Sequence, residues 1–299
     1  MDINSNKPKG HMGSTIKFLS SRDKDLFLKD FNSESQINKL FNSWKYENTY
    51  DVQEINFKDA IINELTKKRL IDLDSFEKLD KKLEKIHLCL NEDMKNLDES
   101  EQNKISVSFY ETSDSLNDLY YKFIREVISP KFQDNIYFQA IPTFRFHFPN
   151  QEGYDWNDRY HTDIMLGHPP FEFNVWLPFT NVYSSNSMRI TSYEDSMTIL
   201  KSCNYNFEDF AEKVQYDDHL CKLLKKKSYA LELNYGEFII FDPRCLHCTQ
   251  HNVTKDTRIS MDIRIITREN LKKYSREYRT TGRKKMLFQP GHYFSKEYV

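Results

Sequence analysis

The sequence predicts an α+β protein in which a helical first half is followed by an antiparallel β-structure. Two observations carry this prediction. Before about residue 135 apolar residues recur at three- and four-residue spacing, and after it apolar and polar residues alternate one by one. We expect one domain over residues 15–299, made of a helical part (15–135), a β-core (136–267) and a C-terminal tail (268–299). Residues 1–14 contain the tag-like stretch GHMGS and are excluded from the fold prediction.

Three segments of the first half have the helical pattern. Residues 25–44 (DLFLKDFNSESQINKLFNSW) and 76–90 (FEKLDKKLEKIHLCL) place apolar side chains on one helical face, with charged residues between them. Residues 113–128 form the third segment, with Ser113 or Ser115 as a candidate N-cap and a proline just past the end. Two other stretches are less regular: 91–104, interpreted as an exposed connection, and 204–227, an insert of unclear structure.

Period-two alternation predicts strands at residues 143–148 (TFRFHF), 172–177 (EFNVWL) and 258–265 (RISMDIRI). Residues 230–243 (ALELNYGEFIIFDP) add two more strands around a turn at 234–236. The three alternating segments carry Arg, His, Asn, Asp and Trp on their polar face. That face either meets water or lines an internal cavity, with the apolar face covered by the helices of the first half.

Composition excludes several classes of function. A net charge of -2 gives no electrostatic case for a nucleic-acid partner, and we interpret the basic runs at 225–227 and 279–285 as solvated surface. Only seven glycines are present, so a glycine-rich phosphate loop is not expected. No apolar run reaches the roughly 20 residues that a membrane span needs. Five scattered cysteines and the absence of a signal-peptide pattern predict a cytoplasmic protein.

The candidate chemistry begins in RYHTDIMLGHPP, residues 159–170, which holds His161 and Asp163. Residues two apart in a strand point to the same side, so both side chains can face inward. Two histidines and one carboxylate on one face of an octahedron leave three positions open, a set that suits Fe(II) and a bidentate cosubstrate. A third ligand is therefore expected from the second histidine-containing segment, DPRCLHCTQHNVTKDTR, at residues 242–258.

That segment offers His247 or His251. They are four apart, so strand parity does not choose between them, but His251 is followed by turn-forming residues and His247 lies nearer the body of the sheet. We therefore predict His247. The CLHC stretch around it also suggests zinc or redox chemistry, yet no second Cys or His pair is suitably spaced and a βαβ context is lacking.

With these residues the chain resembles the Fe(II)/2-oxoglutarate-dependent dioxygenases of the phytanoyl-CoA-hydroxylase-like superfamily. The matching elements are HTD at 161–163, LH ending at His247, and NVTKDTR ending at Arg258. GHPPFEFNVWLPFTN and the following NSM further resemble bacterial members from antibiotic and surface-polysaccharide gene clusters. The resemblance covers residues 136–267.

The resemblance implies a double-stranded β-helix, a cupin-like core of jelly-roll type, with the helical region packed on it. It implies that His161, Asp163 and His247 bind iron, and that Arg258 holds the distal carboxylate of 2-oxoglutarate. That arginine lies eleven residues after the distal histidine, and its planar fork suits a carboxylate. Three further residues are candidate cosubstrate contacts only because their side chains are expected to lie on the inward, polar face of their strands: Ser260, Asn174 and Arg145.

The implied reaction is hydroxylation of an unactivated C–H bond of a small polar metabolite or sugar-type intermediate, using O2 and 2-oxoglutarate. Two alternatives remain. A cupin-like isomerase or epimerase would use histidines as acid and base, and the spacing of Arg258 argues against it. A catalytically silent ligand-binding protein of the same fold would not need a complete ligand set. The sequence does not specify the oligomeric state.

Overall fold

The structure, a computed structural model, describes residues 15–98, 102–152, 157–274, 280–281 and 287–299. It mixes helices with antiparallel sheets, which confirms the α+β prediction. The tag-like residues 1–14, and most of the basic run at 279–285, lie outside the described residues. Among the described helices, none combines the length and the apolar character that crossing a membrane requires.

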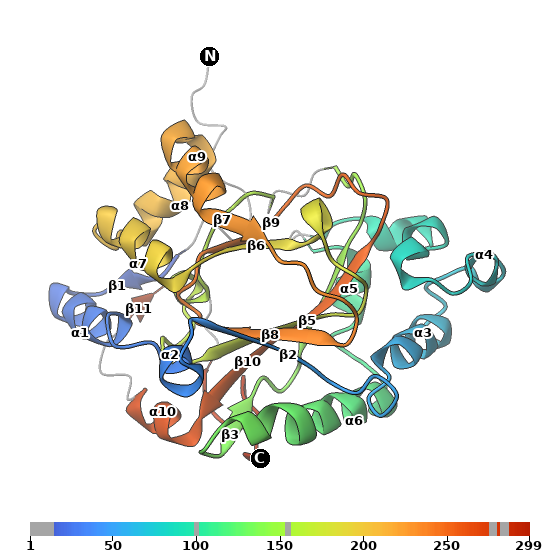
Figure 1. Ribbon diagram of the computed structural model, residues 1–299, viewed down its shortest axis with the longest axis horizontal. Coiled ribbons are helices and arrows are strands. Elements are labelled where there is room, and N and C mark those ends of the chain that lie inside the picture. Colours follow the sequence, from blue (N-terminus) through green and yellow to red (C-terminus); the bar gives the residue numbers. More distant parts are fainter. Residues whose placement is uncertain (1–14, 99–101, 153–156, 275–279, 282–286) are drawn as a thin grey trace.

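The larger sheet has six antiparallel strands in the order β2-β8-β5-β10-β3, with β4 also paired to β10. Their bounds are β2 Lys45–Thr49, β3 Ile136–Phe138, β4 Thr143–His147, β5 Phe173–Pro178, β8 Glu237–Phe241 and β10 Arg258–Thr267. The smaller sheet has the order β7-β6-β9, with β6 at Met188–Thr191, β7 at Ser228–Ala230 and β9 at His247–Thr249. The smaller sheet lies opposite the larger one (Figure 1). A separate pair joins β1 (Lys17–Phe18) to β11 (Thr280–Thr281).

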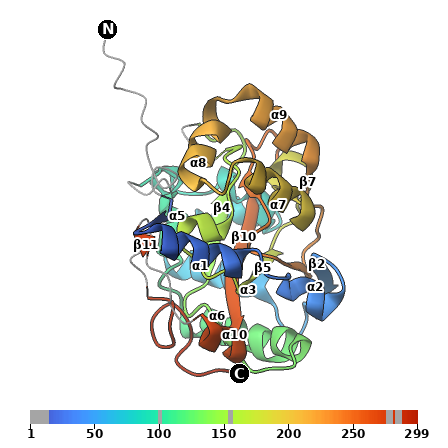
Figure 2. The same cartoon turned by 90° about the vertical axis from the view of Figure 1, so that its left-hand side faces the viewer.

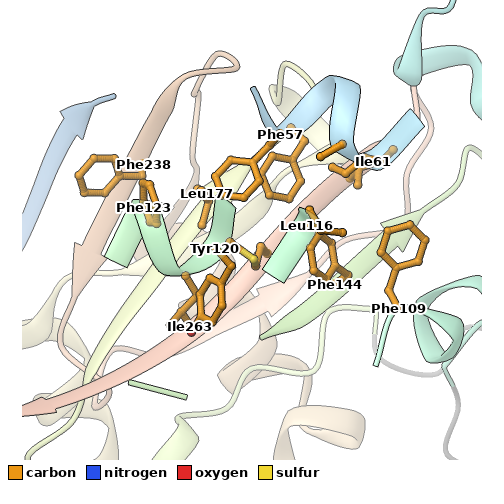
Figure 3. Packing of buried hydrophobic residues seen from close by; sticks show 14 of the residues in the cluster. Phe57, Ile61, Phe109, Leu116, Tyr120, Phe123, Phe144, Leu177, Phe238 and Ile263 are labelled. Carbon is orange, nitrogen blue, oxygen red and sulfur yellow. The ribbon is translucent and has the colours of Figure 1, made fainter. Parts of the chain in front are cut away.

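The three strands predicted from alternation are confirmed as β4, β5 and β10, and β10 pairs with both of the others. Their apolar faces pack under helices α3 (Phe57–Lys67), α5 (Lys104–Ser108) and α6 (Asp114–Phe123). Figure 3 shows the labelled side chains of this layer: Phe57, Ile61, Phe109, Leu116, Tyr120 and Phe123 from the helical half, and Phe144, Leu177, Phe238 and Ile263 from the sheet. Each such side chain contributes about 1.5–3 kcal/mol when fully buried. The polar faces therefore point away from the helices, toward the smaller sheet.

A second cluster fills part of the space between the two sheets. Trp176, Ile239 and Phe241 from the larger sheet pack with Met188 and Ile190 from the smaller one. This cluster holds the sheets together, and polar side chains of β4, β5 and β10 occupy the neighbouring region of the interior.

The first half departs from the helical prediction in three places. Residues 25–44 form two helices, α1 (Ser21–Phe31) and α2 (Gln36–Phe41), and β2 pairs with β8 inside the part expected to be helical. Residues 76–90 are divided between α4 (Leu73–Lys78) and the 3-10 helix Leu83–Leu88.

Two of these departures have a local cause. The Ser35 side chain caps α2 by accepting from Asn38 N, and Asp80 and Lys81 take left-handed conformations that end α4. The third helical prediction is confirmed by α6, which continues as a π-helical turn at Ile124–Ile128. Two short 3-10 helices complete the half, Glu92–Lys95 and Ser129–Lys131.

The insert at 204–227 is helical. It contains α8 (Phe207–Tyr216) and α9 (Asp218–Lys227), which follow α7 (Tyr193–Ser202). These helices share a core cluster with α1 and with Leu246 and Cys248 of the smaller sheet, so they cover its outer face. In both views they lie on the side of the molecule opposite α6 and α10 (Figures 1 and 2).

The described part of the C-terminal tail is not a free extension. Helix α10 (Arg268–Lys273) follows β10, and residues 287–299 pack back onto the larger sheet. Phe288, Tyr293 and Phe294 are buried there, and Ser295 N donates to Phe138 O at 2.7 Å. The segment therefore extends the core behind the end of β10.

Candidate metal centre

The structure brings together the three predicted ligands. One ligand-capable atom of each of His161, Asp163 and His247 lies within 4.8 Å of the other two. His247 Nε2 is 4.0 Å from Asp163 Oδ1, and the two imidazole centroids are 4.6 Å apart. Within the ranges that the structure describes, no other group of three His, Cys, Asp or Glu side chains meets this condition. His251 is exposed and outside the group.

Backbone pairing places the two histidines side by side. His161 N donates to His247 O, and His247 N donates to His161 O, both at 3.0 Å. Residues that exchange both bonds in an antiparallel pair stand opposite each other on the same face. His247 also pairs with Ile190 of β6, so the smaller sheet fixes the position of both histidines along the strand direction.

Asp163 reaches the site by a turn rather than along a strand. It begins the 3-10 helix Asp163–Leu166, which Thr162 caps by accepting from Met165 N at 3.3 Å, and Gly167 ends the turn at φ +95°. The expectation that His161 and Asp163 share one strand face is therefore wrong. The two side chains converge because a cap residue and a left-handed glycine bend the chain between the strands.

Both imidazoles are oriented through their Nδ1 atoms. His161 Nδ1 lies 3.0 Å from Arg159 O, and His247 Nδ1 lies 3.0 Å from Cys245 O. A carbonyl oxygen only accepts, so each Nδ1 must donate and a neutral ring keeps its lone pair on Nε2. This is the arrangement in which histidine binds a metal through Nε2.

The carboxylate of Asp163 is buried and held from one side. Its Oδ2 accepts from Asn174 Nδ2 at 2.7 Å and from Arg264 Nε at 2.9 Å, and Arg264 Nη2 lies 2.8 Å from it as an ion-pair contact. Burial by itself would raise the pKa of Asp163, but the charge of Arg264, with smaller contributions from His168 and the two site histidines, holds that pKa well below its usual range. The group is therefore an ionised carboxylate whose Oδ1 faces the histidines.

These residues line a cavity of about 130 Å³ between the sheets. Arg258, at the start of β10, lines the same cavity, is buried, and donates through Nη1 to Asn186 O at 3.3 Å. Ser260 Oγ is buried on the same face of the strand, with no hydrogen-bond partner among the residues that the structure describes. The cavity wall thus includes the guanidinium of Arg258, while Ser260, two residues further along β10, is not among the residues that line it.

The other two predicted contacts face the same cavity with different neighbours. Asn174 donates to Asp163, as described above, which places it beside the metal-ligating group. Arg145 donates from Nε to Asp262 Oδ2 at 3.3 Å and from Nη1 to Gln102 Oε1 at 3.1 Å. Direct contact of either side chain with a cosubstrate stays a prediction.

The zinc and redox chemistry suggested by the CLHC stretch finds no support in the geometry. Burial raises the pKa of the Cys248 thiol to about 12, and raises that of Cys245 well above its ordinary value. Neither thiol is therefore poised as a redox group at neutral pH, and neither belongs to the group of metal-ligating side chains found among the described residues. His147 is buried with Nε2 2.7 Å from Gln250 O, and burial lowers its pKa well below the usual range, as expected for a structural histidine.

The sequence analysis missed several residues of the cavity wall. Gln102 lines the cavity although residues 91–104 were interpreted as an exposed connection. That interpretation is wrong at the C-terminal end of the stretch. Asn103 next to it is buried, caps α5 and donates to Phe146 O at 2.6 Å. An Asn before an apolar helical pattern is an N-cap signature, so this turn could have been found.

His168 is a second missed residue. It is buried and lines the cavity, with Nδ1 2.9 Å from Glu172 Oε2. Its ring lies against Phe288 and Tyr293 of the C-terminal segment, at centroid distances of 5.0 and 5.5 Å. Only the tertiary fold brings that segment here, so no local pattern in the sequence predicts the contact.

A third missed group fixes the turn before β9. Arg244, the largest fully buried side chain, donates twice to Asp242 at 2.7 Å and twice to the carbonyls of Phe31 and Ser33 at 2.8 Å. Ser35 Oγ donates to Asp242 Oδ2 at 2.6 Å. The α1–α2 connection and the segment leading to the distal histidine are therefore locked together.

Comparison with known proteins gives distant similarities. No protein-family model matches the sequence. The streptomycin biosynthesis protein StrG of Streptomyces griseus is 26% identical over 187 residues, which cover 62% of this chain and 72% of StrG. Among solved structures, the non-heme alpha ketoglutarate dependent carbocyclase SnoK from nogalamycin biosynthesis aligns over 80% of this chain and 85% of its own, with 11% identity and a TM-score of 0.45. The non-heme monooxygenase ThoJ aligns over 52% of this chain, which spans about half of ThoJ (54%), with 13% identity and a TM-score of 0.34.

Proposed function

We propose that the chain is a non-haem Fe(II)- and 2-oxoglutarate-dependent oxygenase of the phytanoyl-CoA-hydroxylase-like superfamily. The observation that carries the proposal is the convergence of His161, Asp163 and His247 within 4.8 Å in a cavity that also holds Arg258. In this proposal residues 15–299 form a single dioxygenase domain, and the two facing sheets are the halves of a double-stranded β-helix.

The residues fit an iron site in three ways. The donors are two imidazoles and a carboxylate, the set that binds Fe(II) on one face and leaves positions open. Both Nε2 atoms carry a lone pair, since each Nδ1 donates to a carbonyl. Asp163 Oδ1 is 4.0 Å from His247 Nε2, and metal bonds of about 2.1 Å would require only a modest approach, to about 3 Å.

Arg258 and Ser260 form the proposed cosubstrate subsite. The guanidinium fork matches a carboxylate bidentately, and its buried position strengthens the interaction. Ser260 Oγ, buried beside it without a partner among the described residues, is able to donate a further hydrogen bond to the same carboxylate. Cytoplasmic location, which was predicted from the cysteines and the N-terminal sequence, and the use of O2 both stay predictions.

When bound, iron with 2-oxoglutarate and O2 supplies the oxidising power: the cosubstrate becomes succinate and CO2, and one oxygen atom enters a C–H bond of the substrate. The protein contributes ligation, orientation and exclusion of water. The cavity wall near Arg145, Asp262 and Gln102 is polar, which favours a polar substrate such as a sugar-type intermediate. The similarity to StrG, described as a streptomycin biosynthesis protein, supports a role in a biosynthetic pathway.

We infer hydroxylation rather than halogenation. In the related halogenases a small residue replaces the carboxylate ligand, and chloride occupies the vacant position. Here Asp163 fills that position and is held there by two hydrogen bonds and an ion pair. Mass spectra of products formed with chloride present should show added oxygen, and a chlorinated product from the wild-type protein would contradict the inference.

The test of the proposed function is succinate release. Purified protein with Fe(II), 2-oxoglutarate and O2 is screened with sugar nucleotides, amino acids and carrier-bound substrates. We expect one class to stimulate succinate formation, and the Asp163→Ala variant to show none. A product formed without loss of 2-oxoglutarate would instead favour a cupin-like isomerase or epimerase, and binding without turnover would favour a silent ligand-binding protein.

A further inference from the structure

We propose that Arg264, assisted by Asn174, is a positioning residue that saturates one oxygen of Asp163 so that only the other oxygen is offered to the metal. The inference rests on the proposed function, because it assigns a role to these residues only if the three-residue group binds a metal. It makes Asp163 a one-oxygen ligand and gives the second arginine of β10 a task distinct from that of Arg258.

The hydrogen bonds single out one oxygen. Arg264 Nε and Asn174 Nδ2 both donate to Asp163 Oδ2, at 2.9 and 2.7 Å, and Arg264 Nη2 lies 2.8 Å from the same oxygen as an ion-pair contact. A carboxylate oxygen offers about two lone-pair directions, so the two donors leave no capacity on Oδ2 for a metal. Oδ1 receives none of these bonds and lies on the side of His247 Nε2, 4.0 Å away.

The donors come from the centre of the larger sheet. Arg264 and Asn174 are direct partners across β10 and β5, two central strands of the larger sheet. The alternate residues of β10 on either side, Ile263 and Ile265, are fully buried in the main core. Asp163 lies in the 3-10 helix between two strands. Arg264 and Asn174, on paired strands of the larger sheet, therefore hold the carboxylate of a residue outside that sheet.

The contact explains why an arginine stands at this position. Its side chain is 14% exposed and that of Asp163 is 3% exposed, so each charge is largely removed from water and requires the other. A lysine would bring a single point charge, whereas the planar guanidinium places two nitrogens within 3 Å of one oxygen, one as a hydrogen-bond donor and one in an ion-pair contact. Arg258, six residues earlier on the same face, contacts Asn186 O instead, so the two arginines do not compete for one partner.

The test measures metal affinity without turnover. Mn(II) is titrated anaerobically into metal-free wild-type protein, Arg264→Met, Arg264→Lys and Asn174→Ala, and free Mn(II) is followed by electron paramagnetic resonance. Loss of a side chain that supports a metal ligand weakens affinity by about 10–100-fold, so we expect this range for Arg264→Met, a smaller loss for Asn174→Ala, and partial recovery with lysine. Arg189→Met is the matched control, since the Arg189 fork donates to Tyr160, Ser228 and the carbonyl of Lys225, outside the site.

A double-mutant cycle separates positioning from a structural effect. If Arg264 acts through Asp163, adding Arg264→Met to Asp163→Ala should cause no further loss of Mn(II) affinity, because the positioned group is already gone. A general structural role would lower affinity by the same factor in both backgrounds. Circular dichroism of each metal-free variant establishes that it is folded before titration.

The outcomes are distinct. Wild-type protein that binds no Mn(II) contradicts the proposed function itself. Wild-type binding together with unchanged affinity in Arg264→Met, or equal losses in both backgrounds of the cycle, overturns this inference and leaves the metal site standing. If Arg264→Met does not fold, Asn174→Ala decides, because it removes one of the two hydrogen-bond donors and keeps the buried ion pair. Unchanged affinity there also overturns the inference.

Discussion

The two faces of strand β10 carry opposite kinds of side chain. Its odd-numbered residues are apolar, fully buried and packed under the helices: Ile259, Met261, Ile263 and Ile265. Its even-numbered residues face the smaller sheet and carry hydrogen-bonding or charged groups: Arg258, Ser260, Asp262 and Arg264. One strand therefore supplies both the core and the site.

Strand β10 separates the residues that stabilise the fold from those that form the site. Burial of the apolar face lowers the free energy of the folded state at about 25 cal/mol per Å². The polar face is also shielded from water, and it is tolerable only because each charge meets a partner, as Arg264 meets Asp163. Substitutions on the apolar face should therefore change stability alone, and substitutions on the polar face should change ligand binding.

The largest effect is expected from Asp163→Ala, which breaks the separation between the faces. It removes a metal ligand and leaves the buried guanidinium of Arg264 without its carboxylate, so both metal binding and stability decrease. Removing one partner of a buried pair costs about 3–5 kcal/mol. Urea unfolding of the metal-free protein should show this loss beside the loss of iron, and a variant with wild-type stability would show that the pair contributes nothing to folding.

Ile263→Ala tests the apolar face of β10 by itself. The side chain is fully buried in the main core, so we expect a loss of about 2–5 kcal/mol in the free energy of unfolding. The folded fraction should bind Mn(II) with wild-type affinity, because the side chain points away from the cavity. Calorimetry and metal titration on the same sample check both parts; weakened metal binding in the folded protein would mean that the two faces are coupled.

Arg258→Ala should have the next largest effect. It should weaken the binding of 2-oxoglutarate and leave iron binding unchanged. Loss of a charge-assisted carboxylate clamp is worth a few kcal/mol, so 2-oxoglutarate affinity should fall by about tens- to hundreds-fold while iron stoichiometry is retained. Anaerobic titration calorimetry with iron-loaded protein measures this. If cosubstrate affinity is unchanged, the clamp lies elsewhere, with Arg145 as the next candidate because Arg264 already contacts Asp163.

The smallest effect is expected from His251→Ala. The side chain is exposed and outside the metal-ligating group, so the variant should keep its iron and its stability within about 0.5 kcal/mol. His247→Ala is its matched partner and should lose iron. Iron analysis after anaerobic reconstitution compares the two; an empty His251 variant beside a loaded His247 variant would reverse the assignment.

The β-core was predictable from the sequence because alternation is a local property. In β4, β5 and β10 it identified both the strands and the polar face, including the positions of Arg145, Asn174 and Arg258. The choice of His247 over His251 also followed from local turn chemistry. These inferences depend only on residues close together in the chain.

The remainder depends on contacts between distant segments. Strand β2 forms because β8 offers an unpaired edge, and the α1–α2 break is fixed by Arg244, more than 200 residues away. Gln102 and His168 enter the cavity wall through the packing of loops whose sequences read as connections. The role of Arg264 required the turn at Asp163, which strand parity did not predict.

The most direct measurement of the central claim is the absorbance of the anaerobic complex with Fe(II) and 2-oxoglutarate. We expect wild-type protein to show the metal-to-ligand charge-transfer band of a cosubstrate chelated to ferrous iron, and His161→Ala to lack it while remaining folded. The band should disappear from the wild-type protein when a chelator removes the metal. Wild-type protein without this band, and without 2-oxoglutarate consumption in the presence of every substrate class tested, would contradict the account.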